Sequence, residues 1–322
     1  MFRAYALDLD EIGSLIPNKP VEYVYDKVDS EKINSTLKDI LQANATFLNG
    51  DELIELFFPS KCCPVFLSHS GLDKSRVEQF AQWLKENFEI NSFIDSDLWG
   101  CIKDLQWQID SNKLAKRSQQ STDQQIKQYV SNRCSGLSFD YTDRNDSTAH
   151  VHVMLCEALA RMIDKAECFI FLGSSNSYSK QKGNGGTFSP WIFHELSTVD
   201  IIRENKNRTS IPNSLPELKY FSQNILECDE GKKKIKVFYP APLKRQALLT
   251  QEDLQKWAGE NFDKKSCNDC KDYMSNDAVR QCEEVAEGTQ DAKEKWEKAL
   301  NWLYKYSHEK WKDNEISTSS LL

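Results

Sequence analysis

Short apolar runs alternate with amphipathic helical patterns through the middle of the chain. Pro64–Leu67 and Cys168–Gly173 are continuous apolar segments, typical of strands that are buried on both faces. Ser92–Asp95 forms a shorter segment of the same kind, and a further strand is predicted at Lys236–Pro240, where a proline ends it. Buried strands that alternate with helices indicate an α/β fold with a doubly wound parallel sheet.

The predicted helices carry apolar residues at spacings of three and four. Ser70 and Asp73 resemble a capping box before the first of them, whereas Ser189 and Pro190 suit the N-cap and first turn of the third. Four apolar faces are expected: Val77, Phe80, Ala81, Leu84 and Phe88; Val151, Met154, Leu155, Ala158 and Met162; Ile192, Leu196, Val199 and Ile202; and Trp296, Leu300, Leu303, Ser307 and Trp311.

The pattern divides the chain into three regions. The α/β domain is expected at residues 61–245, with residues 1–60 as an N-terminal extension and residues 246–322 as a C-terminal helical region. A polar stretch rich in Ser, Gln, Asn and Asp interrupts the domain at residues 111–147. It is too long for an ordinary connection, and it therefore predicts a lid or a disordered loop.

Composition excludes several classes of protein. The 322 residues include 41 basic and 49 acidic ones, which gives a net charge of −8. General nucleic-acid binding needs clustered Lys and Arg, and the one dense group, within 232–236, reads as a solvated strand flank. No apolar run is long enough to span a bilayer, and the N-terminus lacks the pattern of a signal peptide. We therefore expect a cytoplasmic protein with neither nucleic acid nor membrane as a partner.

Metal and cofactor motifs are weak or missing. Cys267, Cys270 and Cys282 have a spacing that suggests zinc, but Cys228 or His308 would have to supply the fourth ligand. Unpaired thiols are the default interpretation. Neither a dinucleotide fingerprint nor a P-loop is present.

A glycine-rich stretch precedes the third predicted helix. Gly183, Gly185 and Gly186 follow no strand directly, so we interpret them as a flexible loop rather than a phosphate cradle.

Polar loops follow the predicted strands, at the sheet edge where ligands bind in such folds. These loops are Ser68–Gly71, Asp95–Trp99 and Ser174–Ser177. Trp191 and Glu195 are four residues apart, so they share a helical face, which we expect to differ from the apolar face of that helix. A candidate site is predicted where these groups meet.

These segments resemble the Toll/interleukin-1 receptor (TIR) domain family. Val65–Lys74 is similar to the opening box of that family, in which a buried strand runs into a Ser-His turn. Phe93–Asp95 resembles the second strand and the start of the BB loop. Ser189–Leu196 resembles the helix with the pattern S-x-W-C-x-x-E-L, with Ile192 in place of the usual cysteine. The three boxes occur in the family's order within residues 61–240.

The resemblance implies a flavodoxin-like sheet and an enzyme that hydrolyses or cyclises NAD+ by cleaving the nicotinamide–ribose bond. Glu195 is then the catalytic residue, because a carboxylate stabilises the oxocarbenium-like cation that forms at the ribose. Trp99, or Trp191 if it is exposed, is expected to stack a ring of the substrate, and Arg144 to bind the pyrophosphate. The residues expected to line the pocket are Ser68, His69, Ser70, Asp95 and Ser174. NAD+ is the substrate, so neither a resident cofactor nor a metal is expected.

Proteins of this kind resemble bacterial anti-phage effectors, including the Thoeris type. That resemblance implies self-association and either NAD+ depletion or a nucleotide signal for a downstream effector. Two alternatives stay open. One is a non-catalytic TIR module that assembles through its BB loop, with Glu195 on its surface. The other is a nucleoside-processing glycosidase or deoxyribosyltransferase on a similar sheet. Three products stay open as well: linear, cyclic or conjugated ADP-ribose.

Overall fold

The computed structural model describes residues 3–16, 35, 49–57, 63–97, 106, 110, 141–181, 184–202, 237–241, 243, 246–260, 262 and 290–319. Several sequence-based expectations lie outside these residues: those on Trp99, the Cys267–Cys282 group, the lysines within 232–236 and most of the predicted insertion. The chain divides into two compact units. One comprises residues 1–25, 60–94 and 160–322, and the other comprises residues 26–59 and 95–159.

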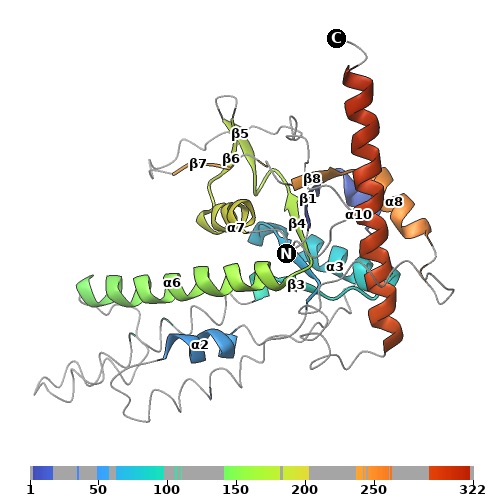
Figure 1. The fold of residues 1–322 in the computed structure, drawn as a ribbon. Helices are drawn as coiled ribbons and strands as arrows, with labels where there is room; N and C mark the ends of the chain where they lie inside the picture. The colour runs from blue at the N-terminus through green and yellow to red at the C-terminus, as the bar shows by residue number, and fades with distance from the viewer. Residues whose placement is uncertain are drawn as a thin grey trace, which may run out of the picture. The chain divides into compact units, whose positions relative to one another are not determined.

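The first unit is built on a parallel sheet, which confirms the predicted α/β class (Figure 1). In the described part of the chain this sheet has five strands in the order β3-β2-β4-β1-β8. Every neighbouring pair in it runs parallel. The strands are β1 (Arg3–Asp8), β2 (Val65–Ser68), β3 (Ser92–Ile94), β4 (Cys168–Gly173) and β8 (Gln246–Leu249).

Strand β1 lies inside the sheet, between β4 and β8. Its register with β4 runs from Arg3 opposite Cys168 to Asp8 opposite Gly173. This differs from the sequence-based division, which placed residues 1–60 in an extension and residues 246–322 in a helical region. The apolar run Ala4–Leu7 is short, and charged residues, Arg3 and Asp8, stand at its two ends although both side chains are buried. Segments far apart in the chain therefore contribute neighbouring strands.

Helix α3 of the first unit follows its predicted pattern, and so does α7 except at Ile202, which lies after the helix and is half-buried. α3 (Lys74–Phe88) follows the short 3-10 helix η2 (Gly71–Asp73) and buries all the apolar positions expected of it. α7 (Pro190–Ile201) starts as predicted, because the Ser189 hydroxyl accepts a hydrogen bond from the Ile192 amide at 3.3 Å. The local start signals in the sequence therefore fixed the position of α7.

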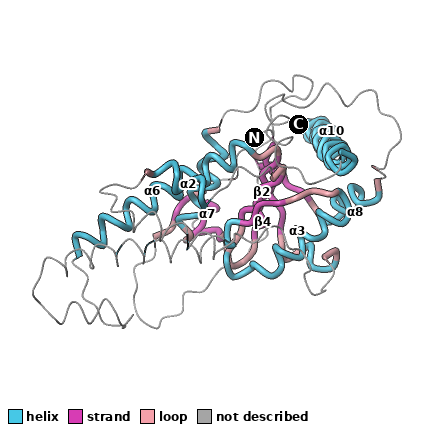
Figure 2. The backbone as a smooth tube through the Cα atoms, turned by 90° about the horizontal axis from the view of Figure 1, so that it is seen from below, coloured by secondary structure: helices cyan, strands magenta, loops and turns pink. Residues whose placement is uncertain are grey.

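α8 (Gln251–Gly259) and α10 (Gln290–Ser319) pack with α3 in one apolar core. Figure 2 shows α3, α8 and α10 beside the strands. On α10, Trp296, Leu300, Leu303 and Ser307 are buried as expected. The side chain of Trp311 lies outside the described part.

A small antiparallel sheet follows β4 in the chain. Its described strands are β5 (Ser179–Gln181), β6 (Asn184–Thr187) and β7 (Tyr239–Pro240), in the order β5-β6-β7. The strand predicted at Lys236–Pro240 thus forms only at its end, and it joins this small sheet rather than the parallel one. Its short length and its proline suit a strand at the edge of a sheet.

Two glycines of β6 are explained by close packing rather than by flexibility. A Cβ on Gly185 would lie 2.1 Å from the hydroxyl oxygen of Tyr178, and a Cβ on Gly186 would lie 2.3 Å from the carbonyl oxygen of Tyr239. The interpretation of this stretch as a flexible loop is therefore wrong for these two residues. Gly183 lies outside the described part.

The second unit contains α2 (Gly50–Phe57), the 3-10 helix η3 (Asp95–Asp97) and the first part of α6 (Tyr141–Lys165). α6 begins inside the stretch predicted as an insertion, so residues 141–147 are helical. It buries Val151, Leu155, Ala158 and Met162 as expected, whereas Met154 is half-buried. Among the described helices, none has the length and apolarity that crossing a membrane requires.

Candidate active site

The candidate site lies at the carboxyl ends of β2 and β4, two neighbouring strands of the first unit. From β2 the chain passes through α3 to β3 on one side, whereas β4 lies on the other side of β2. The strand order therefore reverses between β2 and β4: the chain continues from β2 to one side of the sheet, whereas β4 lies on the other side. In open parallel sheets, ligands bind outside the carboxyl ends of the strands at such a reversal.

Glu195 and Ser68 meet at this reversal. The Ser68 hydroxyl donates a hydrogen bond to Glu195 Oε2 at 2.5 Å. Both residues have an exposed fraction of 0%. Because burying a carboxyl group is unfavourable unless hydrogen bonds compensate, a buried glutamate at a ligand-binding edge is a candidate functional residue. A non-catalytic module would have Glu195 on its surface, whereas here the side chain is buried.

Glu195 belongs to the buried face of α7. It lies three residues after Ile192 and four before Val199, and both of those side chains are buried. On a helix these spacings place side chains on the same face. The expectation of a face distinct from the apolar one is therefore wrong for Glu195. Trp191, four residues earlier, is half-buried.

His69 and Ser70 continue the loop after β2. His69 is buried, and its Nδ1 lies 3.2 Å from the carbonyl oxygen of Leu67. A carbonyl oxygen only accepts hydrogen bonds, so Nδ1 carries the proton, and in the neutral ring Nε2 is left as an acceptor. The Ser70 hydroxyl accepts from the Leu72 amide at 3.4 Å and caps η2. In this loop, His69 therefore bonds the end of β2, whereas Ser70 caps the start of η2.

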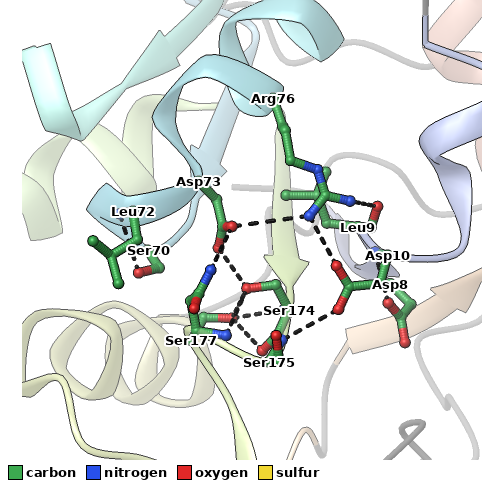
Figure 3. Close-up of polar contacts among 11 residues, drawn as sticks. Asp8, Leu9, Asp10, Ser70, Leu72, Asp73, Arg76, Ser174, Ser175 and Ser177 are labelled. Atoms are coloured by element: carbon green, nitrogen blue, oxygen red, sulfur yellow. Dashed lines mark hydrogen bonds and ion pairs between the residues drawn. The ribbon is translucent and has the colours of Figure 1, made fainter. Parts of the chain in front are cut away.

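Ser174, the candidate residue after β4, is bound to Asp73 (Figure 3). Its hydroxyl donates to Asp73 Oδ2, while Asn176 Nδ2 donates to Asp73 Oδ1 at 2.9 Å. The Ser174 amide donates to the Ser177 hydroxyl at 2.7 Å. The predicted capping box does not form, because the Ser70 hydroxyl accepts from the Leu72 amide while the Asp73 amide donates to the Ser70 carbonyl oxygen at 2.8 Å. The carboxylate of Asp73 serves a long-range contact instead.

Arg76 extends this network to the end of β1. Its Nη1 donates to Asp10 Oδ1 at 2.8 Å and lies 3.9 Å from Asp73 Oδ1. Its Nη2 donates to the carbonyl oxygen of Leu9. Asp10 Oδ2 in turn accepts from the Ser175 amide at 3.3 Å. Figure 3 shows that these contacts join three strand-end segments around the first turn of α3.

Sequence reasoning missed Asp8, Asp10 and Arg76 as residues of this edge. Asp8 accepts a hydrogen bond from the Asp10 amide at 2.9 Å and thereby shapes the turn after β1. The usable signal was Asp8-Leu9-Asp10 after a short apolar run, which is the same strand-then-polar pattern that identified Ser68 and Ser174. It was overlooked because β1 itself was not recognised.

The other predicted site residues are only partly described. Asp95 is buried, but it belongs to the second unit. Arg144 lies in α6, and its side chain is outside the described part; Trp99 is wholly outside it. The structure thus brings together Ser68, His69, Ser70, Ser174 and Glu195 at one sheet edge of the first unit.

No group of three or more His, Cys, Asp or Glu side chains that could hold a metal ion occurs among the described residues. Comparison of the chain with protein-family models, with curated proteins and with solved structures gave no match in any of the three. The fold and the site themselves define an α/β protein with a buried carboxyl group at the ligand-binding edge of a parallel sheet.

Proposed function

We propose that this protein is a TIR-domain enzyme that cleaves the nicotinamide–ribose bond of NAD+, as a hydrolase or an ADP-ribosyl cyclase. The observation that carries the proposal is the fully buried Glu195, held by the Ser68 hydroxyl where the strand order reverses. The segments that resemble the TIR boxes supply both of these residues, one from β2 and one from α7.

The strand order supports a flavodoxin-like sheet. In that fold, the first three strands lie in the order 2-1-3 and two more follow beside the third. Here β3, β2 and β4 take the 2-1-3 positions, and β1 and β8 occupy the next two. The N-terminal strand therefore fills a position that a later strand fills in the usual order. This departure leaves the reversal between β2 and β4 in place, and it brings Asp10 at the end of β1 into the network around Arg76 and Ser175.

The chemistry of the bond suits a single buried carboxylate. When the bond between the ribose C1′ and the nicotinamide nitrogen breaks, the bonding electron pair leaves with neutral nicotinamide, and positive charge develops on the ribose. A preorganised carboxylate in a water-poor environment stabilises that charge more strongly than it would in water. Water then attacks C1′ in hydrolysis, whereas a nucleophile on the same molecule attacks in cyclisation.

Access to Glu195 requires movement. Its exposed fraction is 0%, so a substrate contacts the carboxylate only after neighbouring groups move aside. Such gating suits an enzyme that is switched on by assembly or by a trigger. Self-association, a cytoplasmic role in anti-phage defence and a downstream effector that binds the nucleotide product are parts of the same proposal. Substrate contacts by Asp95, Trp99, Arg144 and Trp191 are further parts of the proposal.

The test is product analysis by mass spectrometry after incubation of the purified full chain with NAD+. We expect nicotinamide together with ADP-ribose or a cyclic isomer from the wild type, and neither from Glu195→Gln, which keeps the side-chain shape. Glu86→Gln, an exposed glutamate of α3, is the matched control and retains activity. Release of bases from nucleosides but not from NAD+ would support the nucleoside glycosidase instead. Full activity of Glu195→Gln would exclude the proposed role of this residue.

A further inference from the structure

Ser68 is held rigidly at the end of β2. Its backbone pairs with Phe171 of β4, and its side chain has no exposed surface. Because a parallel sheet fixes the positions of its strand ends, the backbone of Ser68 is held in place beside Glu195. The contact therefore joins the rigid sheet to a side chain that lies 127 positions later in the chain.

The geometry of the contact bears on the charge of the carboxyl group. A serine hydroxyl has one hydrogen to donate, whereas an ionised carboxylate only accepts. Hydroxyl-to-carboxylate bonds are short, about 2.5 to 2.7 Å between the oxygens. The Ser68–Glu195 distance of 2.5 Å lies in this range. A donor aimed at a carboxyl oxygen stabilises the ionised form of that group, whereas burial by itself opposes it.

We propose that Ser68 is a positioning residue for Glu195, which rests on the proposed NAD+ reaction. Its hydroxyl holds the Glu195 carboxylate ionised and in one orientation, so that the negative charge is in place when the ribose cation develops. Ser68 touches no reacting atom in this role. It acts through the carboxylate.

Ser68→Ala tests the proposal by steady-state kinetics of nicotinamide release at several pH values. Loss of a hydrogen bond to a charged group lowers kcat about 10-fold to 100-fold, while KM changes little. The acidic limb of the pH–rate profile moves to higher pH, because the ionised carboxylate has lost its donor. Ser68→Thr keeps a hydroxyl and recovers part of both effects.

The control is Ser307→Ala. Ser307 is also a buried serine, bonded to the Tyr5 hydroxyl at 2.9 Å in a different part of the unit. If the Ser68 hydroxyl only stabilises the fold, both alanine variants lower the melting temperature and neither shifts the pH–rate profile. An unchanged kcat and pH profile in Ser68→Ala, with an active wild type, would overturn the positioning role and leave the proposed function intact.

A second measurement needs no activity. The thermal stability of Ser68→Ala is compared in two backgrounds, wild type and Glu195→Gln. We expect the serine substitution to lower the melting temperature more when the partner is Glu195, because a neutral amide needs the donor less than a buried carboxylate does. Equal losses in the two backgrounds would contradict the charged contact, whether or not the protein acts on NAD+.

Discussion

Asp253 ties α8 to α10, and removing its cationic partner is expected to weaken the whole first unit. Lys310 Nζ lies 2.7 Å and 2.6 Å from the two carboxylate oxygens of Asp253, and the Tyr306 hydroxyl donates to Oδ1 at 2.8 Å. Asp253 has a side-chain exposure of only 2%, whereas that of Lys310 is 33%. Lys310→Met therefore leaves a buried carboxylate without its cation.

The expected loss follows from this unequal exposure. Breaking a buried ion pair from one side costs about 3 to 5 kcal/mol, whereas an exposed pair contributes about 1 kcal/mol or less. Lys310 is partly exposed, and Asp253 keeps its hydrogen bonds from Tyr306 and Thr250 after the substitution. We therefore expect Lys310→Met to lower the free energy of unfolding by about 2 kcal/mol. Denaturant titration followed by tryptophan fluorescence measures it. Lys305→Met, an exposed lysine of the same helix, is the control and changes stability by less than about 0.5 kcal/mol.

The pH dependence gives a second readout of the same pair. Burial by itself raises the pKa of Asp253, but the hydrogen bonds from Lys310, Thr250 and Tyr306 outweigh it and hold that pKa below its ordinary value. A carboxylate whose pKa is lowered in the folded state stabilises the fold above its unfolded pKa of about 3.9. That contribution is lost as the pH falls through the folded pKa. The stability gap between wild type and Lys310→Met should therefore be full at pH 7 and shrink below about pH 4. A gap that persists unchanged at pH 2, or no gap at pH 7, would refute this reasoning.

Two further predictions concern the small antiparallel sheet and the network around Asp73. Gly185→Ala should lower stability by about 1 to 3 kcal/mol, because its Cβ would collide with Tyr178, whereas Gly259→Ala meets nothing within 4 Å and should be tolerated in the same thermal melt. Asp73→Ala removes the acceptor for Ser174 and Asn176 and should cost about 1 to 3 kcal/mol. Hydrogen exchange should then quicken at residues 174–177, and unchanged exchange there would contradict the role given to Asp73.

The elements that the sequence predicted well are those with strong local patterns. β4 is a continuous apolar run with both ends marked, and α7 carries both a serine cap and a first-turn proline, so neither required long-range information. β1 escaped because its apolar run, Ala4–Leu7, is short and has charged residues at both ends. β8 escaped because Gln246 leaves only three apolar residues, which run directly into the start of α8. Their place in the sheet depends on pairing between distant parts of the chain, which no local pattern records.

The site shows the same division between local and long-range information. The family resemblance selected Ser68 and Glu195, and the structure places them in contact. The burial of Glu195 could not be derived, because a single glutamate on a helix is usually solvated and its partner lies on another element. For Asp73, the sequence predicted a local contact and the structure shows a long-range one. Its spacing from Ser70 suggested a local cap, whereas its carboxylate bonds Ser174 and Asn176 across the sheet edge.

The most direct test of the central claim is the rate of nicotinamide release from NAD+ by the full chain and by Glu195→Gln, measured on protein whose thermal melt shows that it is folded. The account predicts turnover by the wild type and a loss of at least about 100-fold in the variant, as expected when a preorganised charge at the reacting centre is removed. Equal rates for the two folded proteins would contradict it, as would the absence of NAD+ cleavage by the wild type under every condition in which the chain assembles.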